Sequence, residues 1–274
     1  MSAILSYRAH ARAVAALGLP LIGGHVAQYA IGLGDTIMLG WYGVAALAAI
    51  SLASSLFFTI FLLGCGFAWA VMPMVAASAA ADDETAVRRT TRMGLWLSTI
   101  YAMLALPAMI WSESILVALG QTAAVARLGA DYLQLAGFGL LPALLVMVLK
   151  SYLAALERSQ VVFWITVFAA GVNAVANYAL IFGHWGMPEL GIRGAAIGSI
   201  FTHCLSLAAA VGYAVLVLPE HSLFQRLWRP DWDMFGKVLR LGVPIGLTVL
   251  SEVTMFSGSA VMMGWLGTET LAAH

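Results

Sequence analysis

The sequence predicts an all-α, polytopic helical membrane protein with seven membrane spans. Of its 274 residues, 62% are hydrophobic and only 9% are charged, which is about a third of the charged fraction of a soluble domain. Apolar windows of about 20 residues recur, the length at which a helix crosses a bilayer core of roughly 30 Å. These runs are continuous, whereas a membrane barrel needs alternation. The net charge of zero argues against nucleic acid as a partner.

An internal repeat supports this fold class, because segment 17–49 returns as segment 241–273. The offset is constant at about 224 residues without a gap, as an internal duplication produces. Each copy carries one carboxylate in an apolar run, Asp35 in the first and Glu252 in the second. The matched positions include Pro20 with Pro244, Gly18 with Gly242, Gly34 with Gly258, Met38 with Met262, Gly40 with Gly264, Trp41 with Trp265, and Gly43 with Gly267.

The expected elements begin with residues 1–15, a short amphipathic lead-in on the cytoplasmic membrane surface. Span one contains Pro20, Gly32 and Gly34, which predict a hinge because proline removes a backbone hydrogen bond and glycine loosens the helix. The seven spans are expected at about residues 16–39, 46–70, 93–111, 131–153, 161–182, 195–218 and 241–266.

The connections are polar and short. The charged linker AADDETAVRRTTR follows span two, and the Gly- and Pro-containing loop GHWGMPELGIRG separates spans five and six. Residues 219–240 mix charge with Trp228 and Trp232, which suits a cytoplasmic linker lying in the membrane interface.

The repeat also predicts the organisation into lobes. The two copies lie six spans apart, an even number, so both enter the membrane in the same direction. Residues 16–218 are therefore expected to form a six-helix lobe, and residues 241–274 the first helix of a second lobe. A duplication of this period predicts about 450 residues in all, so we interpret the sequence as a fragment or a truncated product.

Positive charge predicts the orientation. With a cytoplasmic N-terminus, eleven of the 13 Lys and Arg residues fall on the cytoplasmic side, Lys150 among them near the end of span 131–153. Only Arg127 and Arg193 fall outside. This asymmetry predicts that the N-terminus is cytoplasmic.

Asp35 and Glu252 are the sharpest functional candidates. A charge near the bilayer centre costs at least about 2.5 to 3.5 kcal/mol on insertion scales, so it is rarely left there without a partner or a task. Either carboxylate could load and release a proton, or hold Na⁺ if enough oxygens surround it. The counterpart of Glu252 in the first copy is Gln28, two turns before Asp35 on the same face. The alternative is that Asp35 caps a turn near the outer mouth.

Span five supplies a second constellation. Asn173 and Asn177 stand at i and i+4, so both amides project from one helix face. They suit a polar cavity with Asp35, but interhelical hydrogen bonding as packing explains them equally well. Thr202 and Tyr132 are weaker candidates to line the cavity, and an interfacial aromatic belt also explains the tyrosine.

No catalytic motif is present. The sequence has no P-loop, no His and Cys at metal-ligand spacing, and no GxSxG elbow. We therefore expect neither an enzyme nor a cofactor, apart from H⁺ or Na⁺ as a coupling ion.

Three motifs occur in order along the chain. They are Pro20, Gln28, Asp35, Thr36, Met38 and Gly40 in span one, NAVANYALIFG at 173–183, and GIRGAAIGS at 191–199. Together they resemble those of the multidrug and toxic compound extrusion (MATE) family, particularly its NorM-like members. The resemblance covers essentially the whole chain, and it implies two six-helix lobes facing each other across a central cleft. It also implies that an inward H⁺ or Na⁺ gradient drives export of cationic drugs.

The resemblance also implies roles for the residues. Asp35 would be the ion-linked carboxylate of the N-terminal lobe, with the two asparagines as polar partners and with Gln28 and Thr202 nearby. Glu252 matches the span-seven carboxylate of NorM-type members. Some members carry a second carboxylate on span five where this sequence has Asn177, which leaves Asp35 as the lone acid of its lobe.

The expected surroundings follow from the same resemblance. Of the twelve helices of the family, seven are present, so the missing C-terminal lobe is an expected partner along with cationic drugs and the lipid bilayer. The expected location is the inner membrane of a bacterium.

Two other functions are weighed against this one. A flippase for lipids or lipid-linked saccharides, with a related two-lobed architecture, needs basic residues in its cleft to hold pyrophosphate, whereas the Lys and Arg residues here are expected in loops. A complete seven-helix receptor or channel leaves the likeness of span seven to span one unexplained.

Overall fold

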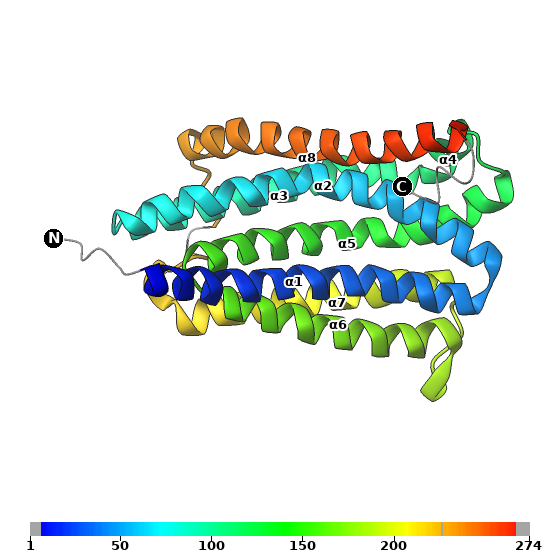
Figure 1. The fold of residues 1–274 in the computed structure, drawn as a ribbon, viewed down its shortest axis with the longest axis horizontal. Coiled ribbons are helices and arrows are strands. Elements are labelled where there is room, and N and C mark those ends of the chain that lie inside the picture. Colours follow the sequence, from blue (N-terminus) through cyan, green and yellow to red (C-terminus); the bar gives the residue numbers. More distant parts are fainter. Residues whose placement is uncertain (1–6, 226, 267–274) are drawn as a thin grey trace.

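The computed structural model describes residues 7–225 and 227–266 as a bundle of long helices (Figure 1). Within these residues, seven helices are long and apolar enough to cross a membrane, which confirms the predicted number of spans. The helices are α1 (Tyr7–Tyr42), α2 (Val44–Ala80), α3 (Glu84–Ile110), α4 (Ser112–Ala118), α5 (Ala123–Ala155), α6 (Ser159–Phe182), α7 (Ile192–Val217) and α8 (Trp232–Leu266), with 3₁₀ turns at His184–Gly186 and Pro219–His221.

Most helices extend past the apolar segments that predicted them. The Asp83 side chain accepts a hydrogen bond from the Ala86 backbone N–H at 2.9 Å, so α3 begins inside the expected charged linker. The Asp231 side chain accepts from the Met234 N–H at 3.1 Å, and α8 begins within the expected interfacial linker 219–240. Hydropathy finds only the apolar part of a helix, whereas a capping carboxylate fixes its actual start.

Helix α1 is continuous through all three expected hinge positions. It also includes the end of the expected lead-in, because it starts at Tyr7. Pro20 removes one backbone hydrogen bond, but the rest of this 36-residue helix and its packing against α6 keep it helical. Flexing at Pro20, Gly32 and Gly34 therefore stays a prediction about another conformation.

The helices are arranged around α5, which has the largest buried share of the seven. It packs against α2, α3 and α7, while α1 packs chiefly against α6. At the opposite edge, α8 lies along α2 and α3 (Figure 1). The helix that carries the second repeat copy therefore lies at the edge of the six-helix lobe.

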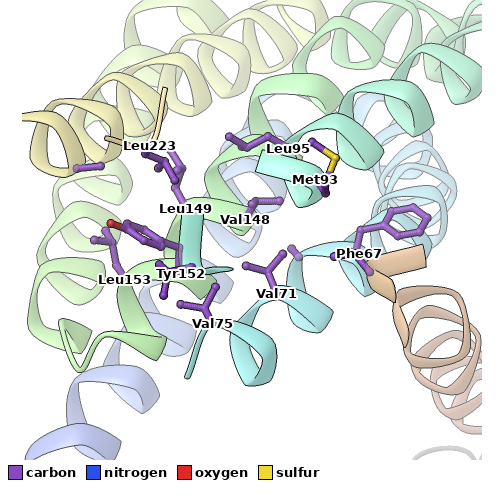
Figure 2. Close-up of a cluster of buried hydrophobic side chains, with 14 of the residues drawn as sticks. Phe67, Val71, Val75, Met93, Leu95, Val148, Leu149, Tyr152, Leu153 and Leu223 are labelled. Atoms are coloured by element: carbon purple, nitrogen blue, oxygen red, sulfur yellow. The ribbon is translucent and has the colours of Figure 1, made fainter. Parts of the chain in front are cut away.

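A hydrophobic core joins α2, α3, α5 and the segment before α8 (Figure 2). Val71, Met93 and Leu149 are fully buried in it. Tyr152 is also buried, and its hydroxyl hydrogen-bonds His221 Nδ1 at 2.5 Å. The core therefore fixes the connection between α7 and α8 as well as the helices.

Glycines bring α8 close to α2. A Cβ at Gly66 would overlap the Gly242 carbonyl oxygen and the backbone of Gly246. A Cβ at Gly246 would lie 2.7 Å from the Leu63 carbonyl oxygen. Small residues at such contacts let helix backbones approach within a membrane, where van der Waals packing is a main source of association.

We expect Gly246→Ala to destabilise the packing of α8, because its methyl group meets a backbone atom that cannot rotate away. Overpacking of this kind costs about 1–3 kcal/mol and should lower the thermal unfolding midpoint. Gly236→Ala is the control on the same helix, because its Cβ meets nothing within 4 Å. Equal midpoints for the two variants would contradict the close contact.

Candidate functional site

Asp35 lies inside the bundle, where helix α1 meets α6 and α7. Its side chain is buried, with the residue 8% exposed. Asn177 Nδ2 donates to Asp35 Oδ1 at 2.5 Å, and Ser199 Oγ donates to Asp35 Oδ2 at 3.2 Å. Each carboxylate oxygen therefore accepts a hydrogen bond from a neutral side chain on a different helix.

Asn173 and Asn177 are both buried and do share a face of α6, as their spacing predicts. Asn177 Nδ2 also donates to Asn173 Oδ1 at 3.2 Å, so one amide connects the other to Asp35. Asn177 Oδ1 and Asn173 Nδ2 are buried without a hydrogen-bond partner. A buried polar atom left unpaired costs about 1–3 kcal/mol. The two amides can therefore form further hydrogen bonds beside the carboxylate.

The glycines of the GIRGAAIGS motif explain how α7 comes so close to α6. A Cβ at Gly194 would overlap the Leu180 carbonyl, and a Cβ at Gly198 would overlap Asn177 Oδ1. Gly198 is followed by Ser199, so the close approach also brings the serine hydroxyl to Asp35. Ser199 was not among the expected site residues, because a serine at the end of a glycine motif gives no signal of its own.

The two weaker candidates, Tyr132 and Thr202, differ in their contacts with the Asp35 site. Tyr132 on α5 is buried and lies close to Ser199 and Asp35. It is therefore part of the site. Thr202 is also buried, but its hydroxyl donates to the Gly198 carbonyl at 2.8 Å. Thr202 thus supports the α7 backbone at the site without a recorded hydrogen bond to Asp35.

Gln28 contacts Lys150 and has no hydrogen bond to Asp35 among those of the described residues. Lys150 Nζ donates to Gln28 Oε1 at 3.0 Å. Lys150 is among the basic residues expected in loops in the comparison with a flippase, but it lies within α5, five residues before Ala155, as the expected span 131–153 implies. Its charge also acts on His203 and Cys65, which stand near the middle of α7 and α2. The ammonium therefore reaches into the bundle, away from the nearer helix end.

Glu252 is exposed on α8 and is not brought to Asp35. In the described part of the chain, no recorded ion pair includes Glu252 or Asp35. The same residues contain no group of three or more His, Cys, Asp or Glu side chains that could hold a metal ion. The candidate site is therefore a single buried carboxylate among neutral oxygens and amides.

Comparison with known proteins gives consistent matches. The MatE family model matches residues 20–179. The probable multidrug resistance protein NorM of Rhizobium meliloti (strain 1021) is 45% identical over 272 residues, which cover 98% of this chain and 58% of that protein. The protein of the same name from Agrobacterium fabrum (strain C58 / ATCC 33970) is 42% identical over 271 residues, again 98% of this chain and 58% of that protein.

The fold has a solved counterpart. A crystal structure of a MATE protein in the bent conformation matches with a TM-score of 0.82 at 22% sequence identity. The match covers 95% of this chain and 58% of that one. The chain spans 58% of the length of each of the two NorM proteins.

We expect Gly198→Ala to disrupt the site from the α7 side. The added methyl group would overlap Asn177 Oδ1, so the asparagine must move from Asp35 or α7 must move from α6. The free energy of unfolding should fall by about 1–3 kcal/mol, measured by chemical denaturation. Gly212→Ala, on the same helix and in open space, should be neutral or stabilising by up to about 1 kcal/mol. A neutral Gly198→Ala would disprove the close packing.

Proposed function

Since the chain belongs to the MatE family of multidrug and toxic compound extrusion transporters, we propose that it forms the cation-coupling lobe of a secondary antiporter. The antiporter exports cationic amphipathic compounds in exchange for H⁺ or Na⁺. The observation that carries this proposal is the buried Asp35 carboxylate, bonded to Asn177 and Ser199. The family consists of transporters, in agreement with the expected absence of enzymatic activity.

The electrostatic environment of Asp35 supports a role in cation binding. Its recorded hydrogen-bond donors are neutral, and no cationic side chain among the described residues forms an ion pair with it. A charge inside a membrane helix is costly and marks a functional site by default. A cation bound at this carboxylate neutralises its charge and so removes that cost.

Proton loading would change the hydrogen bonds at Asp35. The carboxylate only accepts hydrogen bonds, whereas the protonated acid gains one O–H donor. Asn177 Oδ1 is a buried acceptor without a partner, and its amide already contacts Asp35. The protonated acid can donate to this oxygen after the amide turns, which would alter the contact between α1 and α6.

Sodium fits the same group of residues. Hard cations prefer oxygen ligands, and oxygens are supplied by Asp35, Asn173, Asn177 and Ser199. Bound Na⁺ would supply positive charge only. The residues would hold it and exclude water, and the side-chain amides would turn their oxygens toward the carboxylate.

The conformational step rests on differential binding. A cation shifts the transporter between two states only by as much as it prefers one of them. Loading Asp35 would weaken the present contact with Asn177 and let α1 flex near Pro20. Flexing would loosen the hold of the cleft on a cationic substrate.

The rest of the transporter would complete this mechanism. Glu252 on α8 would supply the corresponding carboxylate of the second lobe, and it would face that lobe because α8 lies at the edge of the first one. The relatives are bacterial, which supports our proposal that the protein lies in the bacterial inner membrane. The distribution of Lys and Arg supports a cytoplasmic N-terminus.

Lys150 bears on the flippase alternative. Its position inside the bundle removes part of the argument that all basic residues lie in loops. A pyrophosphate would need several such charges, however, and Lys150 has Gln28 as its recorded hydrogen-bond partner. Membership of the MatE family also argues against a complete seven-helix receptor or channel.

Asp35→Asn should abolish gradient-driven efflux, because an amide cannot bind a proton at this position and carries no charge for Na⁺. Efflux of a fluorescent cationic dye is measured in cells that express the protein from its native gene, with a proton gradient or a sodium gradient imposed. The gradient that drives wild-type efflux identifies the coupling ion.

The matched control is Asp131→Asn, which makes the same chemical change at a partly exposed carboxylate that pairs with Arg193. This control should retain efflux. Full efflux by Asp35→Asn under both gradients would refute the assigned role.

A further inference from the structure

Helices α3 and α8 begin at the same end of the bundle (Figure 1). A basic cavity opens there. Its volume is about 610 Å³. It lies far along the bundle from Asp35, which is seven residues from the other end of α1, so it is separate from the proposed ion site. The residues that determine its character are Arg88, Arg89, Arg92, Arg229, Asp231 and Trp232.

Hydrogen bonds to α3 hold the wall of this cavity in place. Trp96 Nε1 donates to the Leu227 carbonyl at 2.7 Å, and Arg92 Nη2 donates to the Arg229 carbonyl at 2.8 Å. The Asp231 backbone N–H lies 3.4 Å from Met93 Sδ. The segment before α8 is thereby fixed against α3, so arginines from both segments line one preformed cavity.

The charges in the cavity do not cancel. Arg89 pairs with Asp231, and this hydrogen bond holds the pKa of the Asp231 carboxyl below its usual value. Asp231 is therefore stabilised in its ionised form and offsets one positive charge. Arg88 and Arg229 form no recorded ion pair with a carboxylate of the described chain. The cavity is consequently positive and has guanidinium groups available for an anion.

Aromatic residues place the cavity at membrane-interface depth. Trp232 lines it and is 73% exposed, and Trp228 nearby is 76% exposed. Exposed indoles concentrate at the level of lipid headgroups. The cavity therefore lies at the depth where the anionic headgroups of membrane lipids are found.

We propose that this cavity binds the headgroup of an anionic phospholipid, with Arg88 and Arg229 holding its phosphate. Guanidinium groups bind phosphate oxygens in pairs, and basic pockets at the membrane surface bind such headgroups. The bound lipid would bridge α3 and the segment that leads to α8. It would therefore reinforce the connection between the six-helix lobe and the helix that follows.

The test is native mass spectrometry of the purified chain with phosphatidylglycerol, phosphatidylcholine or inorganic phosphate. The double variant Arg88→Gln with Arg229→Gln removes both proposed ligands. Lys237→Gln with Arg240→Gln removes two exposed charges of α8 outside the cavity and is the control. Thermal unfolding without lipid verifies that each variant folds, and the Arg88→Lys with Arg229→Lys variant keeps the charge in the cavity.

We expect wild-type protein to retain phosphatidylglycerol in preference to phosphatidylcholine. Affinity should fall about tenfold or more in the cavity double variant, since it removes two basic groups that attract the anionic headgroup. The control should bind as wild type, and the lysine variant should bind more tightly than the glutamine variant. Three results would overturn the proposal: equal losses in cavity variant and control, no preference for the anionic lipid, or equal affinity for free phosphate.

Discussion

A carboxylate inside a bundle of apolar helices must be stabilised by its own surroundings, and this requirement organises the N-terminal lobe. Asp35 receives hydrogen bonds from Asn177 on α6 and Ser199 on α7. Both donors can reach it because Gly198 lets α7 approach α6 so closely. The glycine motif and the paired amides therefore serve one electrostatic purpose. Both donors are neutral, and this is the basis of the role in cation binding that we propose for the carboxylate.

The two copies of the repeat differ at the positions of their polar residues. Gln28 and Glu252 occupy equivalent positions in the two copies, but they differ in charge and in contacts. Gln28 accepts a hydrogen bond from Lys150 within the first lobe, whereas Glu252 is exposed on α8. The duplicated helices have thus diverged, with the carboxylate two turns further along in the first copy. The basic cavity at the other end of the bundle lies where the first lobe is connected to α8.

The sequence predicted what depends on local pattern. Apolar length predicted the seven spans, and a spacing of four residues predicted that Asn173 and Asn177 share a face. It did not predict the contact of Ser199 with Asp35 or of Lys150 with Gln28, because both depend on contacts between helices distant in sequence. Helix ends were also misplaced, since Asp83 and Asp231 extend α3 and α8 into segments that hydropathy scores as polar. The hinge at Pro20 stays a prediction about another conformation, because α1 is continuous through this residue here.

The most direct test of this account is the titration of Asp35 itself. Infrared difference spectroscopy of the purified protein in lipid would follow the carboxyl C=O band as pH is lowered, with Asp35→Asn as the reference. We predict a protonated-carboxyl band that grows in the wild-type protein and is absent from the variant, and that shifts when Asn177 is replaced by leucine. Identical difference spectra for wild type and Asp35→Asn at every pH, with and without Na⁺, would contradict the claim that Asp35 binds the coupling ion.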